Sequence, residues 1–248
     1  MVMTQDENAA IIEPKKGKRE AALPSVGLLV FTLQDIDLFI RCFPQPPRRS
    51  HKIFLTDVYT ATYEGTAVAL AGPLLGAPQA VVVLEKLIAL GVRSIIALGW
   101  CGSLQESVRI GDVVLPTGAV SEEGTSGHYP IALPDPGPSS GLFLSLRNAL
   151  RKELSGIHEG RIWTTDAPYR ETLGKVLTHQ RQGVLAVDME ASALFTVAHY
   201  RRAQLAMALI VSDELSTLKW VHGLREPGFR RTREALSGLI LKVICSTE

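Results

Sequence analysis

The amino-acid sequence predicts a single α/β domain with helices on both faces of a largely mixed sheet, a three-layer α/β/α sandwich. Short and nearly continuous apolar runs at residues 26–31, 94–98 and 205–211 are typical of strands buried on both faces. These runs alternate with longer segments of helical periodicity, as in other layered α/β domains. With 248 residues, 46% of them hydrophobic, the chain can form one sizeable core, and we find no internal repeat or linker that would divide it.

The first 22 residues differ in composition from the rest. They are polar and charged, with a basic cluster from Lys15 to Arg19, and they lack the apolar core of a secretory signal. We therefore expect residues 1–22 to form a flexible arm and residues 23–248 to form the domain. A solvated tail is favoured over a nucleic-acid patch because the basic run is short.

The first half of the domain is expected to contain a strand, a helix, a three-stranded meander and a β-α-β unit. Prolines after residue 43 separate the first helix from the meander, and Glu64-Gly65 is expected to be a tight turn. Gly91 ends a helix whose apolar residues recur at helical spacing. The expected elements are strand 26–31, helix 34–41, strands 52–56, 58–63 and 66–71, helix 77–90 and strand 94–98.

The second half continues the alternation after Gly111-Asp112. Residues 130–141 contain four prolines and two glycines, so we expect a loop there and a candidate lid over a site. The expected elements are strand 113–120, helix 142–154, strand 161–164, helix 171–181, strand 184–187, helix 189–200, strand 205–211 and helix 228–244.

Two acidic residues that follow strands are the strongest candidates for chemistry. Ligands of such folds bind beyond the carboxyl ends of strands, and Glu190 and Asp213 come shortly after two of them. Together they suit an enzyme that holds a sugar with one acid and acts on a base with the other. Structural alternatives stay open: Glu190 could stabilise a helix start, although Asp188 is better placed for that, and Asp213 or Glu214 could cap the next segment.

Composition argues against several other classes of protein. A net charge of +1 gives no reason to expect nucleic acid or an anionic membrane as a partner. The three cysteines form no CxxC pair, which argues against a disulfide framework or zinc site and fits a cytoplasmic location. No His/Cys/Asp cluster has metal-ligand spacing, and no GxGxxG follows the first strand, so neither a metal nor an organic cofactor is expected.

Six short motifs together resemble the phosphorylase superfamily, which includes purine nucleoside phosphorylase, uridine phosphorylase and methylthioadenosine nucleosidase. The resemblance extends over about residues 26–244. It implies a single domain around a distorted mixed sheet, phosphate as a co-substrate, and assembly as dimers or as hexamers built from dimers. In order along the chain, the motifs are GPLLGAPQ (72–79), LGWCGSL (98–104), IGD (110–112), EGTS (123–126), VDME (187–190) and VSD (211–213).

The resemblance also implies roles for particular residues. Glu190 corresponds to the acid that accepts hydrogen bonds from the ribose hydroxyls, and Met189 to the residue that packs on the sugar. Asp213 resembles the acid that protonates or hydrogen-bonds the leaving purine, which would otherwise depart as a poor anionic leaving group. The further substrate-binding residues that it implies are Gly99, Trp100, Cys101, Gly102, Asp166, Pro168, Tyr169, Asp188 and Ser212.

The phosphate site departs from the family pattern. Thr32 and Asp35 lie in the loop where phosphorylases carry Gly-Asp-Pro-x-Arg, while Ala97 and Trp100 replace an arginine and a Ser or Thr. Phosphate would therefore need Thr32 together with charge from Lys52, Arg48 or Arg49 of a neighbouring subunit. Otherwise water is the nucleophile, with Asp35 as the nearest match to the activating acid of nucleosidases. Trp100 either fills the vacated phosphate cavity as packing or stacks on a ligand.

The expected activity is cleavage of the N-glycosidic bond of a nucleoside to free base and ribose 1-phosphate. A purine base is favoured because Thr172 and Gly174 stand near the positions of the pyrimidine-binding Gln and Arg of uridine phosphorylases. Two alternatives remain: a phosphate-independent nucleoside hydrolase, and a catalytically silent nucleoside-binding protein that has lost the phosphate site.

Overall fold

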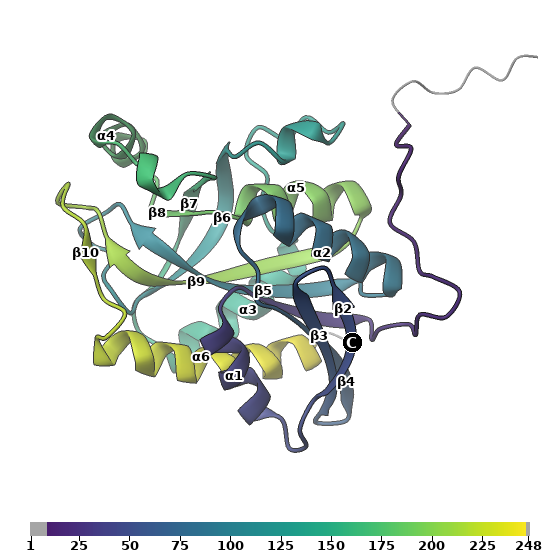
Figure 1. Cartoon of the computed structure of the whole chain (residues 1–248). Helices are drawn as coiled ribbons and strands as arrows, with labels where there is room; N and C mark the ends of the chain where they lie inside the picture. The colour runs from purple at the N-terminus through teal and green to yellow at the C-terminus, as the bar shows by residue number, and fades with distance from the viewer. Residues whose placement is uncertain (1–8, 247–248) are drawn as a thin grey trace, which may run out of the picture.

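A ten-stranded mixed sheet forms the centre of the computed structural model, which describes residues 9–246 (Figure 1). Its strand order is β10-β9-β6-β7-β8-β5-β1-β4-β3-β2. β9 pairs in parallel with β5 and antiparallel with β6, so the part of the sheet from β9 through β6, β7 and β8 to β5 closes on itself. This closure gives the sheet its distorted shape.

The sheet and its covering helices follow the chain in regular alternation. The elements are β1 (Val26–Val30), α1 (Leu33–Cys42), β2 (Arg48–Ile53), β3 (Thr56–Tyr63), β4 (Thr66–Gly72), α2 (Gly76–Leu90), β5 (Ser94–Ser103), β6 (Val113–Glu122), η1 (Ser126–His128), α3 (Ser140–Glu153), β7 (Ile157–Thr165), η2 (Pro168–Arg170), α4 (Leu173–Arg181), β8 (Ala186–Asp188), α5 (Ala191–Arg201), β9 (Gln204–Glu214), β10 (Val221–His222) and α6 (Pro227–Cys245).

Helices cover the sheet on both sides, which confirms the predicted α/β/α sandwich. α2 and α5 pack together on one face, and α1, α3 and α6 cover the other (Figure 1). Each face has its own apolar core, centred on residues such as Leu84 and Phe195 on the first and Phe39 and Phe229 on the second. These four side chains are essentially inaccessible to solvent, so both layers contribute to hydrophobic stabilisation.

The predicted meander is confirmed, but one of its turns is displaced. β2, β3 and β4 pair antiparallel in sequence order, and Glu64 and Gly65 both have positive φ at the expected tight turn. The reversal between β2 and β3 lies at Phe54-Leu55, where Phe54 has a φ of 51°, rather than at residue 57. β2 is a polar edge strand, so no apolar alternation marks its ends.

β5 and β9 run further than the sequence predicted. Gly99 and Gly102 lie within β5, not at its end, and the register with β9 shifts between Cys101 and Gly102. A Cβ atom on Gly99 would come within 2.4 Å of the Phe31 ring, so this glycine allows close packing of β1 on β5. The predicted end of this strand at residue 98 was wrong, because β5 continues to Ser103 alongside its partner β9 although its last residues are not a continuous apolar run.

The N-terminal segment crosses one side of the domain without forming a helix or strand between residues 9 and 22 (Figure 1). Glu20 pairs with Lys86 at 2.6 Å and Glu13 with Arg201 at 2.9 Å. Residues 1–8 of the expected arm lie outside the described residues, and its flexibility stays a prediction. Within the described part of the chain, no helix is long and apolar enough to cross a membrane.

Candidate active site

One cavity of about 570 Å³ lies where β1, β5, β8 and β9 end. Glu190 and Asp213, which are 23 positions apart in the chain, both line it. The sequence-predicted residues that also line it are Thr32, Trp100, Cys101, Gly102, Pro168, Tyr169, Asp188, Met189 and Ser212. Leu74, Leu75, Glu171, Leu215 and Trp220 are among the lining residues that the sequence did not single out.

Glu190 is held at the junction of two helix starts. It is the residue before the first turn of α5, and its side chain does not cap that helix. Instead, its Oε1 accepts a hydrogen bond of 2.7 Å from the backbone N–H of Gly76, the first residue of α2. Gly76 has a φ of 77°, a conformation that favours glycine. The GPLLGAPQ motif therefore supplies a backbone donor that orients this acid, which sequence reasoning had not assigned.

Asp188 positions Glu190 by capping α5. Its Oδ2 accepts hydrogen bonds from the N–H groups of Ala191 at 2.8 Å and of Glu190 at 3.1 Å, while Thr164 Oγ1 donates to Oδ1 at 2.6 Å. The helix-start role suggested for Asp188 is therefore present in the structure. Both carboxylate oxygens are engaged and the side chain is buried, so the contacts seen for Asp188 hold the start of α5, and its role in binding substrate stays a prediction.

Burial makes ionisation of this acid pair costly. It raises the pKa of Glu190, and the charge of Asp188 raises it further. Burial also raises the pKa of Asp188, although hydrogen bonds from Thr164 and from the backbone partly oppose the rise. A pocket that contains such an acid favours ligands that supply hydrogen-bond donors to it.

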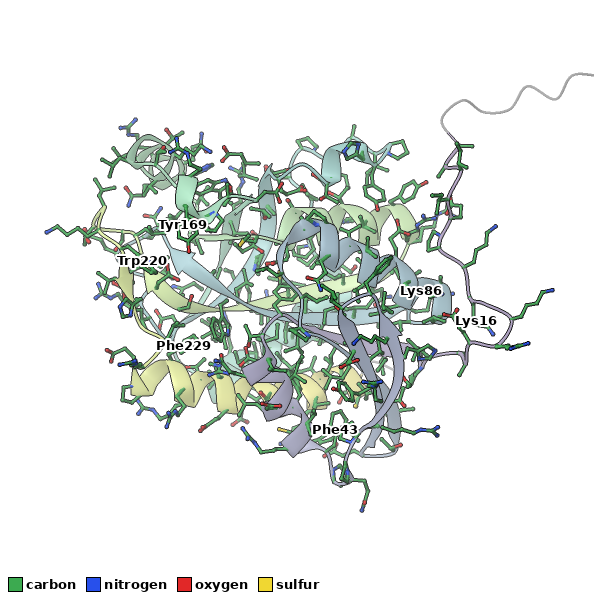
Figure 2. All side chains as sticks on the ribbon, viewed as in Figure 1. Lys16, Phe43, Lys86, Tyr169, Trp220 and Phe229 are labelled. Carbon is green, nitrogen blue, oxygen red and sulfur yellow. The ribbon has the colours of Figure 1, made fainter. Side chains whose placement is uncertain are left out.

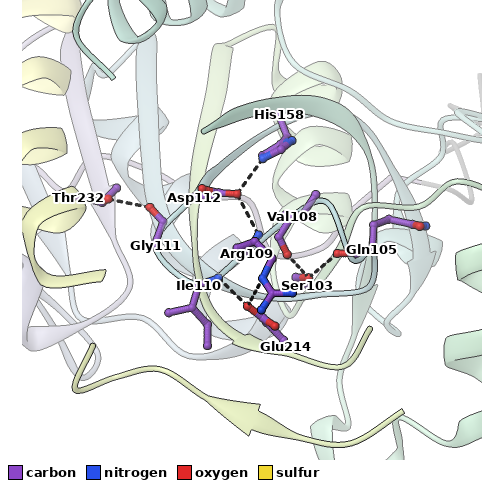
Figure 3. A network of polar contacts seen from close by, with 10 residues as sticks. All are labelled: Ser103, Gln105, Val108, Arg109, Ile110, Gly111, Asp112, His158, Glu214 and Thr232. Atoms are coloured by element: carbon purple, nitrogen blue, oxygen red, sulfur yellow. Dashed lines mark hydrogen bonds and ion pairs between the residues drawn. The ribbon is translucent and has the colours of Figure 1, made fainter. Parts of the chain in front are cut away.

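Asp213, not Glu214, is the acid of this segment that faces the cavity. Figure 3 shows Glu214 in a separate network, where its Oε1 accepts from Ile110 N at 3.0 Å and pairs with Arg109 Nε at 3.1 Å. Asp213 accepts instead from Ser212 Oγ at 2.7 Å and from Trp220 Nε1 at 3.0 Å. The alternation of side chains along β9 sends neighbouring residues to opposite faces.

Glu171 is a cavity residue that sequence reasoning missed. It follows η2, and no hydrogen bond from its carboxyl group to another described side chain is seen. Burial raises the pKa of Glu171 to about 7, with a contribution from the charge of Asp213. Tyr169 and Trp220 also line the cavity and lie at the same end of the molecule in Figure 2, and the two residues are 98% and 69% exposed. The only sequence signal for Glu171 was its closeness to Pro168, which had been singled out. Residues in a loop follow no periodic pattern that would mark one of them as facing a cavity.

Asp35 cannot serve as the water-activating base considered from the sequence. It is fully buried and pairs with Arg233 Nε at 2.6 Å. Its other oxygen accepts from Thr32 Oγ1 and Trp100 Nε1, each at 2.7 Å. A carboxylate with its oxygens engaged in this way has no access to solvent water.

Trp100 is anchored by packing on the side that faces away from the cavity. Its ring meets Phe229 edge-on at 5.1 Å between centroids, and the guanidinium of Arg233 lies 5.2 Å from its ring. The Asp35 carboxylate fixes the indole nitrogen. These contacts favour the packing role, and because Trp100 also lines the cavity, stacking on a ligand stays a prediction.

The cavity carries acids and lacks basic residues. Glu171, Asp188, Glu190 and Asp213 contribute its carboxyl groups, and no Lys or Arg within residues 9–246 lines it. The tentative phosphate residues Arg48 and Lys52 lie on exposed β2, outside the cavity.

Several other predicted residues also lie outside. Gly99 packs in the core, and Asp166 accepts from Gly124 N at 2.8 Å beside a second cavity. The predicted loop forms over residues 130–139, because α3 already begins at Ser140, and it lines no part of the first cavity, so it is not a lid over it. It bonds instead to the sheet, where Ala119 N donates to Pro136 O at 2.9 Å.

Other catalytic chemistry finds little support at this site. Burial raises the pKa of the Cys101 thiol well above its usual value, so this side chain is a poor nucleophile. Among the described residues, no group of three or more His, Cys, Asp or Glu side chains could hold a metal ion. The chemistry that the cavity offers is hydrogen bonding and proton transfer by carboxyl groups.

A family model described as "Phosphorylase superfamily" matches residues 25–244, nearly all of the domain. The chain belongs to the phosphorylase superfamily. This confirms the family resemblance seen in the six motifs, and the matched region includes every residue that lines the cavity.

Relatives within the superfamily include two classes of purine enzyme. The chain is 33% identical over 156 residues to a guanosine phosphorylase from Halorubrum lacusprofundi, and the aligned region covers 63% of this chain and 64% of that protein. It is also 33% identical over 164 residues to a DeoD-type purine nucleoside phosphorylase from Brevibacillus brevis, covering 64% and 68%. The chain therefore matches about two thirds of the length of these curated relatives.

Solved superfamily structures share the fold across the domain. Uridine phosphorylase from Vibrio fischeri superposes with a TM-score of 0.82 at 20% identity, covering 91% of this chain and 93% of the other. Purine nucleoside phosphorylase from Toxoplasma gondii, in complex with immucillin-H, gives 0.81 at 17% identity, covering 90% and 91%. At these identities the likeness establishes the fold.

Proposed function

We propose that this chain is a nucleoside phosphorylase that cleaves the N-glycosidic bond of a purine nucleoside to free base and ribose 1-phosphate. The observation that carries the proposal is the presence of Glu190 and Asp213 in one cavity of about 570 Å³. That volume is within the range of small-molecule sites and accommodates a furanose with its base. The names of the guanosine and purine nucleoside phosphorylase relatives support the purine class.

Glu190 would hold the sugar. Gly76 N–H occupies its Oε1, so the rest of the carboxyl group can accept hydrogen bonds from ribose hydroxyls. These bonds strengthen as the sugar acquires oxocarbenium character, because the hydroxyl protons become more acidic. Met189, which also lines the cavity, would pack against the ring. The catalytic contribution of Glu190 would therefore be greatest in the transition state.

Asp213 and Glu171 would act at the base. Asp213 would protonate or hydrogen-bond a ring nitrogen of the departing purine and so avoid release of an anion. Glu171 has no described side-chain partner, and the charge of Asp213 contributes to its raised pKa. Glu171 would accept hydrogen bonds from donor groups on the edge of the base. Pro168, Tyr169 and Ser212 would complete this end of the pocket.

Phosphate would need positive charge from outside this chain's cavity. Thr32 lines the cavity, but its hydroxyl donates to Asp35. Arg48 and Lys52 are exposed on β2 and are therefore available to a second copy of the chain. We propose that they reach the cavity of a neighbouring subunit in a homo-oligomer, a dimer or a hexamer of dimers. The cysteine pattern supports a cytoplasmic location.

Hydrolysis is a second candidate, and the charge of the cavity favours it. A pocket with several carboxyl groups and no described basic residue repels a phosphate dianion and admits neutral water. The same acids could stabilise the cationic sugar in either reaction.

Base release from guanosine, inosine, adenosine and uridine, with and without phosphate, tests these functions together. Phosphate-dependent release from the purine nucleosides, with ribose 1-phosphate as product, is the expected result. Release at an equal rate without phosphate would identify a hydrolase. Binding without turnover would identify a silent nucleoside-binding protein.

A further inference from the structure

Trp220 is a cavity residue that the proposed reaction leaves without a role. Its indole Nε1 donates to Asp213 Oδ2 at 3.0 Å, and the residue is 69% exposed. It lies at the same end of the molecule as Tyr169 (Figure 2), and both line the cavity. An exposed aromatic ring that also contacts the acid of the site suggests a function in the reaction.

The pairing of β10 with β9 places Trp220 beside Asp213. Val221 is opposite Glu214, and His222 is opposite Asp213. Opposed residues in an antiparallel pair share a face, and residues two apart in a strand do so as well. Trp220 directly precedes this strand, and it lies beside both residues: its indole donates to Asp213, and its ring is 5.6 Å from that of His222.

The turn that carries Trp220 is fixed at its base. Leu215 N donates to Ser103 O, and Gly223 N donates to Ser212 O, each at 2.8 Å. A Cβ atom on Gly223 would come within 2.2 Å of Ile110, so this glycine allows the strand to approach the loop after β5. The indole is therefore presented from an anchored hairpin.

The two hydrogen bonds to Asp213 define the plane of its carboxyl group. Ser212 Oγ donates to Oδ1 at 2.7 Å and Trp220 Nε1 donates to Oδ2. Rotation about the last bond of an aspartate side chain is otherwise broad. The indole N–H can only donate a hydrogen bond, so Trp220 cannot accept the proton that Asp213 passes to the base. Each carboxyl oxygen of Asp213 retains a second lone pair for the ligand.

We propose that Trp220 is a positioning residue whose indole N–H orients the Asp213 carboxyl group toward the departing base, while its ring covers the base at the cavity mouth. The inference rests on the proposed cleavage of purine nucleosides. A planar bicyclic base offers the indole a larger face than a pyrimidine does, so the same residue contributes to purine preference.

Steady-state kinetics of Trp220→Phe and Trp220→Ala on guanosine and 7-methylguanosine separate the two roles. The methylated base carries its positive charge already and leaves without protonation. Trp220→Phe keeps a ring but loses the donor, so kcat for guanosine should fall about tenfold, the effect of one hydrogen bond to a charged group, with KM nearly unchanged. Cleavage of 7-methylguanosine should be unaffected.

Trp220→Ala should show the same loss of kcat and also a higher KM for both substrates, because the covering ring is gone. Lys219→Ala is the matched control, since Lys219 is exposed in the same turn and does not line the cavity. It should behave as the wild type.

The outcomes distinguish this inference from the proposed function. If the wild-type chain cleaves guanosine and Trp220→Phe cleaves it equally well, the positioning role is overturned and the proposed function stands. Equal losses on guanosine and 7-methylguanosine in Trp220→Phe also overturn it, because orientation of a proton donor would not matter for the second substrate. If the wild-type chain cleaves no nucleoside in either the presence or absence of phosphate, both proposals are rejected.

Discussion

Replacing Glu190 by glutamine should make the protein more stable at neutral pH and less active. The side chain is only 5% exposed, and burial together with Asp188 raises the pKa of its carboxyl group. Glutamine keeps an acceptor for Gly76 N–H but carries no charge. The substitution therefore removes the cost of ionising this group inside the protein and also removes the charge that would bind the sugar.

The sign of the stability change follows from linkage. The folded-state pKa of Glu190 is raised above its ordinary value of about 4.5, so its stabilising contribution is fully present below that value and is lost as pH rises through the folded pKa. Each unit of raised pKa corresponds to about 1.4 kcal/mol. We expect Glu190→Gln to exceed the wild type in free energy of unfolding at pH 8, by an amount on the order of 1 kcal/mol or more, with a smaller difference at pH 5.

The loss of activity follows from the hydrogen bonds to the sugar. A hydrogen bond to a charged group contributes about 1.5–3 kcal/mol, and a neutral amide retains part of it. For two ribose hydroxyls this predicts a fall of about 10- to 100-fold in kcat/KM.

Urea denaturation at pH 5 and pH 8, with parallel nucleoside cleavage assays, measures both effects. Glu85→Gln is the matched control: Glu85 is similarly buried but pairs with Arg201 at 2.6 Å, so its amide should reduce stability at pH 8. A Glu190→Gln variant less stable than the wild type at pH 8 would refute the burial argument. Unchanged kcat/KM would refute the role of Glu190 in holding the sugar.

Three further predictions concern the other charged residues of the site. Asp213→Asn should lower kcat for guanosine by about 10²- to 10⁴-fold, the usual contribution of a general acid, and leave 7-methylguanosine cleavage nearly intact; equal losses on both would contradict proton transfer. Arg233→Met should lower the free energy of unfolding by about 3–5 kcal/mol, because it leaves the fully buried Asp35 without its ion-pair partner. Exposed Arg230→Met on the same helix is its control, and similar denaturation midpoints for the two variants would count against the argument. Glu171→Gln should remove an ionisation near pH 7 from the pH profile of kcat/KM. It should also abolish the loss of stability that the wild type shows as pH rises through about 7. A pH profile identical to that of the wild type would exclude Glu171 from the reaction.

The sequence predicted the interior strands well because burial on both faces leaves a continuous apolar run. Residues 26–31 and 205–211 correspond closely to β1 and the buried part of β9. The polar end of β9, Ser212 to Glu214, was missed because it extends by pairing with the end of β5 and with β10, a two-residue strand with no pattern of its own. The polar edge strand β2 was displaced for a related reason.

The location of two acids at one cavity could be predicted because their position in the chain sets their position in the fold, while their roles stay predictions. Glu190 follows β8 and Asp213 lies near the end of β9, and the ends of these two strands meet at the cavity. Glu171 and Trp220 reach the cavity from loops, so no spacing marked them. Asp35 was misassigned because its partner, Arg233, lies 198 residues further along the chain.

By itself, the sequence determined the layered α/β fold, the superfamily and the pair of acids at the strand ends. Those features depend on the local pattern of apolar residues and on short motifs. Each such pattern or motif lies within one continuous stretch of the chain. Only the tertiary structure decided which carboxyl groups are buried, which are paired, and which are left to meet a ligand. Those properties depend on Gly76, Arg233 and Trp220, which approach their acidic partners only when distant segments pack together.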